Sequence, residues 1–229
     1  MGKKYKLTEE TINVYDRTLH RIESLRDFGN VKKGDKGGFI ENEDNLSQWD
    51  DCWVYDNAMV FKNAMVYGNA QVYGDAQVYG DAQVSGDAQV YGNAKVCGDA
   101  RVYGDARVYG NAMVFKNAQV YGNAMVFGDA EIYDNVRVYG NAEVFGNVHI
   151  KGDADISNIS DYIFFKNWWS SGRCFTWTRS NNMWSVGCFY GTGEELIAKA
   201  YKDSEISGRE YKRVVKYVET TIINDGKDQ

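Results

Sequence analysis

The 229-residue chain contains no proline and no closely paired cysteines. Cys52, Cys97, Cys174 and Cys188 are widely spaced without a CxxC motif, which argues against a zinc site built from cysteines. No apolar run approaches the roughly 18 residues of a membrane-spanning helix. The basic start of the chain lacks the apolar segment of a secretory signal. We therefore expect a cytoplasmic protein with reduced thiols.

An excess of positive charge is also missing. Lysine and arginine number 26 against 32 aspartates and glutamates, which gives a formal net charge of −6. General binding to DNA or RNA requires a basic surface that can neutralise phosphates. We therefore do not expect general nucleic-acid binding.

The chain does have an internal repeat of six residues. The pattern V-[Y/F]-G-[N/D]-A-x runs for 17 consecutive hexads from Val54 to Asp155 without an insertion. The first position is valine except at Ile132 and Ile150, and the fourth position is asparagine or aspartate throughout. A fixed period of this length predicts a solenoid built from stacked repeats.

Each position of the hexad has a physical role. Side chains alternate across a strand, so the β-branched valine is expected inside and its neighbours outside. Alanine, two positions before the valine, points inward again and is small enough for a turn. Glycine followed by Asn or Asp tolerates positive φ, so each hexad ends in a corner. Three sides close one coil, and 17 hexads predict about six three-sided coils of parallel strands.

The hexads resemble those of the hexapeptide-repeat superfamily of left-handed parallel β-helices, for example in Val72-Tyr73-Gly74-Asp75-Ala76-Gln77. The left hand is implied by this resemblance, because parallel crossovers are otherwise right-handed. The V-Y-G-[N/D]-A-x variant looks like uncharacterised phage and prophage proteins. The segment from Leu25 to Ser47 resembles the N-terminal cap of those proteins. The resemblance implies a phage-encoded protein that acts in the host cytoplasm.

The chain is expected to divide into three regions. A short β-rich N-terminal cap spans residues 1–53, the β-helix spans 54–159, and a small α+β domain spans 160–229. In the last region, alternation predicts strands over 162–165, 173–179 and 183–190. Thr192 and Ser207 each begin a capping-box pattern, which predicts two helices. The fold class is therefore an all-β solenoid with a small α+β appendage.

The second position of the hexad is Tyr or Phe in 14 of 17 repeats and should face outward. Because every third hexad stacks, these rings form three ladders. Stacked rings stabilise neighbouring strands, and so large an apolar exterior also marks a buried interface. We expect a homo-oligomer, a trimer as the superfamily implies. The expected interface residues are Tyr73, Tyr91, Tyr109 and Phe127.

Superfamily members are often acyltransferases with a histidine base near a subunit interface. This chain has His20, in an expected edge strand, and His149, at an outward position of a late hexad. His149 keeps an acyltransferase as an alternative, although the usual acyl-donor loop is absent. Two histidines cannot supply the three zinc ligands of the carbonic-anhydrase branch. Threonine is absent between Thr18 and Thr176, which excludes an ice-binding threonine ladder. We expect neither a metal nor a cofactor.

The C-terminal region carries four of the six tryptophans, next to arginine and asparagine. Such residues can bind a nucleotide or peptide by stacking and bidentate hydrogen bonds. The alternative is that they form the core of a small domain that covers the open end of the solenoid. The candidate ligand or partner residues are Trp168, Trp169, Arg173, Trp177, Arg179, Asn182 and Trp184.

The sequence thus predicts a non-catalytic, homo-oligomeric binding protein, phage-encoded, that blocks or sequesters a host component. Such a component would be a defence effector or a nucleotide signal. The alternatives are an acyltransferase that uses His149 and a structural scaffold or virion component. Alanine at Trp177 and Arg179 is expected to abolish partner binding and leave the oligomer intact.

Overall fold

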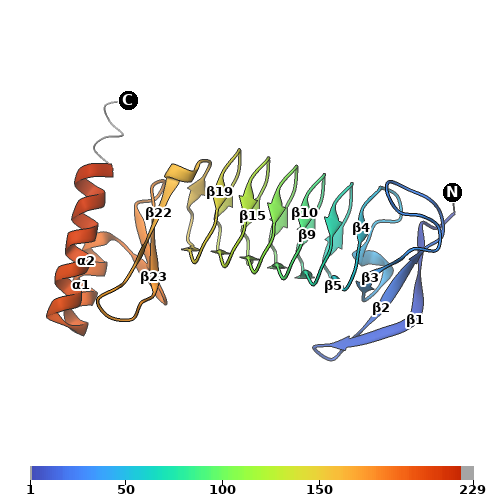
Figure 1. The fold of residues 1–229 in the computed structure, drawn as a ribbon, viewed down its shortest axis with the longest axis horizontal. Coiled ribbons are helices and arrows are strands. Elements are labelled where there is room, and N and C mark those ends of the chain that lie inside the picture. Colours follow the sequence, from blue (N-terminus) through green and yellow to red (C-terminus); the bar gives the residue numbers. More distant parts are fainter. Residues whose placement is uncertain (1, 223–229) are drawn as a thin grey trace.

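The computed structural model describes residues 2–222 of the chain. It is a rod-shaped β-solenoid with an N-terminal strand region at one end and a small α+β domain at the other (Figure 1). The solenoid strands stack in parallel with a register of 18 residues, so Gln71 pairs with Gln89 and Val72 with Val90. This confirms the fold class that the hexads predict.

The strands of the solenoid are short and evenly spaced, as the repeat requires. Their bounds are β4 (Trp53–Val54), β5 (Met59–Lys62), β6 (Met65–Val66), β7 (Gln71–Val72), β8 (Gln77–Gly80), β9 (Gln83–Val84), β10 (Gln89–Val90), β11 (Lys95–Gly98), β12 (Arg101–Val102), β13 (Arg107–Val108), β14 (Met113–Val114), β15 (Gln119–Val120), β16 (Met125–Val126), β17 (Glu131–Ile132), β18 (Arg137–Val138), β19 (Glu143–Val144), β20 (His149–Ile150) and β21 (Asp155–Ile156).

These strands form three sides. Side 1 is the six-stranded sheet from β4 to β19, and side 3 is the six-stranded sheet from β6 to β21. Side 2 runs from β5 to β20 and is extended by the N-terminal strands. The solenoid therefore has six complete coils, and Leu46, bridged in parallel to Val66, helps to begin a seventh. The left hand stays a prediction that rests on the resemblance.

The interior of the solenoid is a column of valine, isoleucine and alanine. The first and fifth positions of all 17 hexads are 0% exposed. Each fully buried valine contributes roughly 1.5–3 kcal/mol of hydrophobic stabilisation. The column therefore holds the coils together without any large side chain inside them.

The corners of the coils depend on one left-handed residue in each hexad. The third position has φ between 52° and 83° in every hexad, including the non-glycine residues Asp56, Lys62, Lys116 and Asp134. The fourth position does not share this conformation, contrary to the role predicted for Asn and Asp. Instead, several of its side chains hydrogen-bond along the column, as Asn135 Nδ2 donates to Asp153 Oδ1 at 2.9 Å.

The N-terminal region extends side 2 by three strands, β1 (Tyr5–Val14), β2 (Arg17–Ser24) and β3 (Lys36–Ile40). β3 pairs in parallel with β5, whereas β1 and β2 form an antiparallel hairpin. β2 lies between β1 and β3, so the expectation that His20 lies in an edge strand is wrong. The His20 Nδ1 atom lies 3.1 Å from the carbonyl oxygen of Thr8.

The C-terminal domain is a four-stranded antiparallel sheet with two helices packed on its outer face, away from the solenoid (Figure 1). Its elements are β22 (Tyr162–Lys166), β23 (Cys174–Thr178), β24 (Met183–Val186), β25 (Phe189–Gly191), α1 (Gly193–Asp203) and α2 (Glu205–Tyr217). Gly187, with φ of 54°, divides the strand predicted over 183–190. Thr192 caps α1 as predicted, but Ser204, not Ser207, caps α2.

Candidate functional site

The C-terminal domain covers the open end of the solenoid. Backbone N–H groups of the last coil have no following coil to bond, and an unpaired strand edge is prone to aggregation. Three side-chain hydroxyls accept these hydrogen bonds: Phe145 N donates to Tyr162 Oη at 3.2 Å, His149 N to Thr176 Oγ1 at 3.3 Å and Asp155 N to Ser180 Oγ at 2.8 Å. These hydrogen bonds therefore hold the C-terminal domain against the last coil of the solenoid.

A buried lysine also contributes to this contact between the domain and the solenoid. Lys151 takes the hexad position that is usually aromatic and is only 7% exposed. Its Nζ lies 5.5 Å from the ring centroid of Tyr133 and 5.9 Å from that of Tyr190, and it donates to the carbonyl of Gly187 at 3.2 Å. Burial lowers the pKa of Lys151 and raises the pKa of Tyr133 to about 12.

Two of the predicted tryptophans form the domain core. Trp177 is 0% exposed and Trp184 is 2% exposed, in one cluster with Phe175 and Leu196. The Trp177 Nε1–H donates to Asn182 Oδ1 at 2.8 Å, so Asn182 satisfies a buried donor. In this structure the two buried rings have no free face for a ligand. The core alternative raised by the sequence therefore describes their positions.

The other predicted aromatic residues differ in exposure. Trp168 is 77% exposed. Trp169 is half-buried and packs edge-on against Tyr211 at 5.0 Å, and its buried Nε1–H has no partner among the described residues. Arg179 lies 5.9 Å from the ring of Trp177 and donates from Nε to the carbonyl of Ser160 at 3.3 Å. The structure thus does not bring all seven candidates to one surface.

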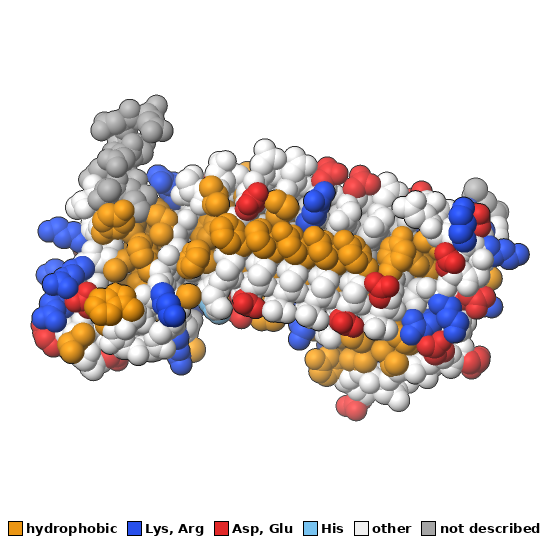
Figure 2. Space-filling model, in the orientation of Figure 1, with side chains coloured by type: hydrophobic (Ala, Val, Ile, Leu, Met, Phe, Trp, Pro, Cys, Tyr) orange, Lys and Arg blue, Asp and Glu red, His pale blue; other side chains and the backbone are white. Residues whose placement is uncertain are grey.

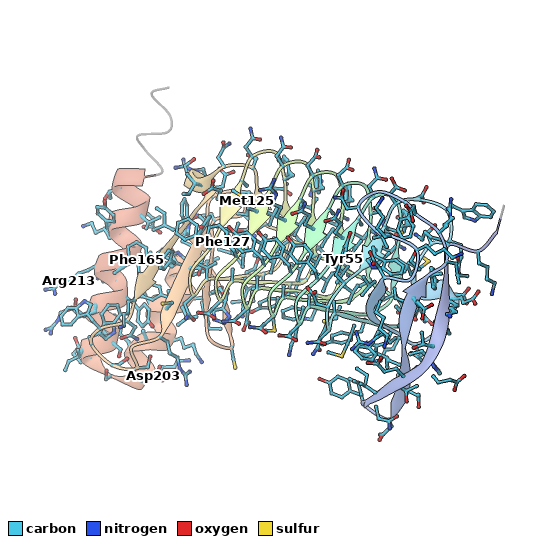
Figure 3. All side chains as sticks on the ribbon, turned by 45° about the vertical axis from the view of Figure 1, so that its right-hand side comes forward. Tyr55, Met125, Phe127, Phe165, Asp203 and Arg213 are labelled. Atoms are coloured by element: carbon cyan, nitrogen blue, oxygen red, sulfur yellow. The ribbon has the colours of Figure 1, made fainter. Side chains whose placement is uncertain are left out.

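A cavity of about 580 Å³ lies between the β24–β25 turn, the loop before β23 and both helices. Arg173 is the one predicted residue that lines it. Lys199 and Asp203 on α1 also line it, together with Phe189, Tyr190 and Tyr211. The ring of Tyr190 points to the other face of the sheet, toward Lys151 and Gly152 of the solenoid. The sequence does not mark Lys199 and Asp203 as site residues, because an i, i+4 pair of opposite charges is typical of a solvated helix face. Asp203 lies near the end of α1 (Figure 3).

The outward aromatic residues form the predicted ladders. On side 1, the rings from Tyr73 to Phe145 stack with centroids 4.7 to 5.2 Å apart and interplanar angles of at most 15°. Tyr55 extends this ladder edge-on at 6.5 Å. Figure 2 shows a continuous hydrophobic stripe along this side of the rod, on which Figure 3 labels Tyr55 and Phe127. The four predicted interface residues are neighbours within this stripe.

The ladders on the other two sides are interrupted. Cys97 separates the stacked pair Phe61–Tyr79 from Phe115–Tyr133 on side 2. On side 3, Ser85 separates Tyr67 from the stack that begins at Tyr103. Side 1 therefore offers the longest unbroken aromatic surface of the three.

One known family of repeats matches parts of the solenoid. The solenoid is similar to the YdcK beta solenoid repeat. Residues 70–86, 76–92 and 118–130 match that family model, and the first two matches are offset by six residues, the length of one hexad. No curated protein matches the chain. The matches support a β-solenoid repeat, and they do not extend to the C-terminal domain.

His149 lies outside the cavity but has an acidic neighbour. Its Nδ1 is 2.9 Å from Glu131 Oε2 on the preceding coil of side 2, and both side chains are about 30% exposed. A carboxylate in this position orients an imidazole ring. Among the described residues, no group of three or more His, Cys, Asp or Glu side chains could hold a metal ion. No helix in the described part of the chain is long and apolar enough to cross a membrane.

Proposed function

We propose that the protein is a non-catalytic, homo-oligomeric binding protein that blocks or sequesters a host component. The observation that supports this most is the cavity of about 580 Å³ in the C-terminal domain. Its size lies within the range of small-molecule sites, roughly 300–1,000 Å³. The sequence resemblance supports a phage origin, action in the host cytoplasm, and a defence effector or a nucleotide signal as the host component.

The stripe on side 1 is the proposed interface of a homotrimer. The rings of Tyr91 and Tyr109 stack face to face at 4.8 Å, so their faces are occupied by each other. A partner therefore meets a flat row of ring edges, which suits another protein surface better than it suits a planar ligand. A second copy of the chain supplies a surface of matching length and spacing.

Native mass spectrometry of paired variants tests this interface. Tyr91→Lys places a charge in the stripe of side 1, and we expect it to convert the trimer to monomers. Tyr121→Lys is the matched control on side 3, where Tyr121 stacks on its neighbours at 4.9 and 5.3 Å. Equal oligomer masses for both variants and the wild type would contradict the assignment of side 1.

Sequestration is tested by what the protein retains and releases. The protein is incubated with the small-molecule fraction of a bacterial lysate, and its native mass is compared with its denatured mass. We expect a discrete extra mass for each subunit, and the same molecule recovered chemically unchanged after heat release. A converted product would indicate an enzyme, and no added mass, together with no soluble protein partner, would indicate a scaffold.

A second candidate function, acyl transfer, is favoured by the 2.9 Å contact between His149 and Glu131. In that function His149 acts as the general base and Glu131 orients its ring. Release of coenzyme A from acetyl-coenzyme A, measured with a panel of amine and hydroxyl acceptors, tests it. Activity that is lost in His149→Ala and reduced in Glu131→Gln would favour this function over sequestration.

A further inference from the structure

We infer that the cavity of the C-terminal domain binds a nucleoside monophosphate or a closely related ring-bearing phosphate. This inference rests on the proposed binding function and specifies the class of its ligand. The phosphate would be held by Arg173 and Lys199, and the ring would lie against Phe189.

The charges of the cavity favour an anion. Arg173 and Lys199 contribute two positive charges and Asp203 one negative charge, so these three residues give the lining a formal charge of +1 on a chain whose net charge is −6. Within residues 2–222, the guanidinium of Arg173 and the ammonium of Lys199 have neither an ion pair nor a side-chain hydrogen bond. Arginine binds phosphate in a bidentate manner, and lysine binds it as a point charge.

Arg173 is also positioned by the fold. It follows the tight loop in which the buried Asn167 accepts a hydrogen bond from Ser170 N at 3.0 Å and donates to Tyr211 Oη at 3.0 Å. An Arg173 guanidinium nitrogen lies 3.5 Å from the point where a Cβ of Gly187 would stand. The guanidinium therefore lies over the β24–β25 turn, at the wall of the cavity.

The rest of the lining suits a ring and a sugar better than a bare anion. The partly exposed Phe189 provides aromatic surface on which a base can stack. The Ser207 hydroxyl and the Asp203 carboxylate provide further polar groups for ribose hydroxyls or an exocyclic amine. Inorganic phosphate would leave these groups unused, and a nucleoside without phosphate would leave the two cations unused.

Isothermal titration calorimetry on the full-length protein tests the inference. The probes are AMP, GMP, CMP and UMP, with adenosine and inorganic phosphate as the two partial ligands. The variants are Arg173→Gln, Lys199→Gln and the double variant. Lys202→Gln removes a charge from the same helix without touching the cavity and serves as the control. Circular dichroism and melting temperature verify that each variant is folded.

We expect saturable binding of at least one monophosphate, with much weaker binding of adenosine and of phosphate. Arg173→Gln and Lys199→Gln should each weaken binding about tenfold or more, as for the loss of a hydrogen bond to a charged group. Lys202→Gln should bind like the wild type. Absence of binding at millimolar concentration, equal affinity for adenosine, or unchanged affinity of the double variant would overturn the inference.

The oligomer and the retained mass are measured on the same samples. A trimer that retains a ligand of another class would reject the nucleotide and leave the proposed binding function intact. A protein that retains nothing and binds no probe would count against both.

Discussion

The aromatic ladder on side 3 is interrupted at one position, where a substitution could raise the free energy of unfolding of the solenoid. Ser85 lies between Tyr67 and Tyr103, at a position that is tyrosine in the other hexads of that side. The rings of Tyr103 and Tyr121 stack at 4.9 Å, which is the geometry that a ring at position 85 would adopt with its neighbours. We predict that Ser85→Tyr stabilises the protein.

The magnitude follows from the stacking energy of a ring at this position. A tyrosine there would form two new stacked pairs, one with Tyr67 and one with Tyr103. Aromatic pairs contribute about 0.5–1.5 kcal/mol each beyond the area that they bury. The free energy of unfolding should therefore rise by about 1–3 kcal/mol, less the entropy of ordering one side chain. The backbone is not strained, because Gly86, not Ser85, has the left-handed φ of 67°.

Equilibrium unfolding in urea measures this change, and Ser85→Ala is the control that removes the hydroxyl without adding a ring. Part of the gain should disappear when Ser85→Tyr is combined with Tyr103→Ala, and the double-mutant cycle isolates the stacking energy. A Ser85→Tyr protein no more stable than Ser85→Ala would refute the reasoning. So would a gain that is fully retained in the double variant.

Three further predictions concern the core, the domain junction and alkaline pH. Val102→Ala removes two methyl groups from a side chain that is 0% exposed and should lower the free energy of unfolding by about 2–3 kcal/mol, measured in urea. Gly152→Ala places a Cβ against the Tyr190 hydroxyl, at a residue with φ of 77°, so we expect it to detach the C-terminal domain from the solenoid. Proteolysis after residue 160 should become faster, whereas the circular dichroism of the solenoid should not change. Burial raises the pKa of Tyr133 to about 12, above the unfolded value of about 10. The contribution of the neutral Tyr133 side chain to the free energy of unfolding is therefore present below pH 10 and is lost as the pH rises from 10 to about 12. Tyr133→Phe should remove that part of the alkaline loss.

The solenoid could be predicted from the sequence because each hexad position carries its own physical requirement. Val and Ala must face inward, and the third position must accept a positive φ, in every coil. The repetition confirms each assignment many times, so an exception such as Lys116 does not obscure it. The role of the fourth position could not be inferred in this way, because corner formation and the hydrogen bonds along the Asn and Asp column favour the same residue types.

The candidate site was harder to predict because the residues that suggested it serve the fold. Clustered tryptophans are equally typical of a binding surface and of the core of a small domain, and burial of Trp177 and Trp184 distinguishes the two only in three dimensions. This changes the proposed test of function. Trp177→Ala would remove a fully buried ring at a cost of about 3–5 kcal/mol and unfold the domain, so loss of partner binding would not identify a site.

Arg173 and Lys199 are better probes, because both side chains are exposed at the cavity and neither belongs to the buried cluster of the domain. Their loss should change recognition without changing the melting temperature. The useful signal in the sequence was therefore an arginine beside the tryptophans. Lys199 gave no such signal, because only the packing of α1 brings it close to the same cavity. A partner that still binds the Arg173→Gln and Lys199→Gln double variant must use another surface, and the exposed Trp168 is then the first residue to replace.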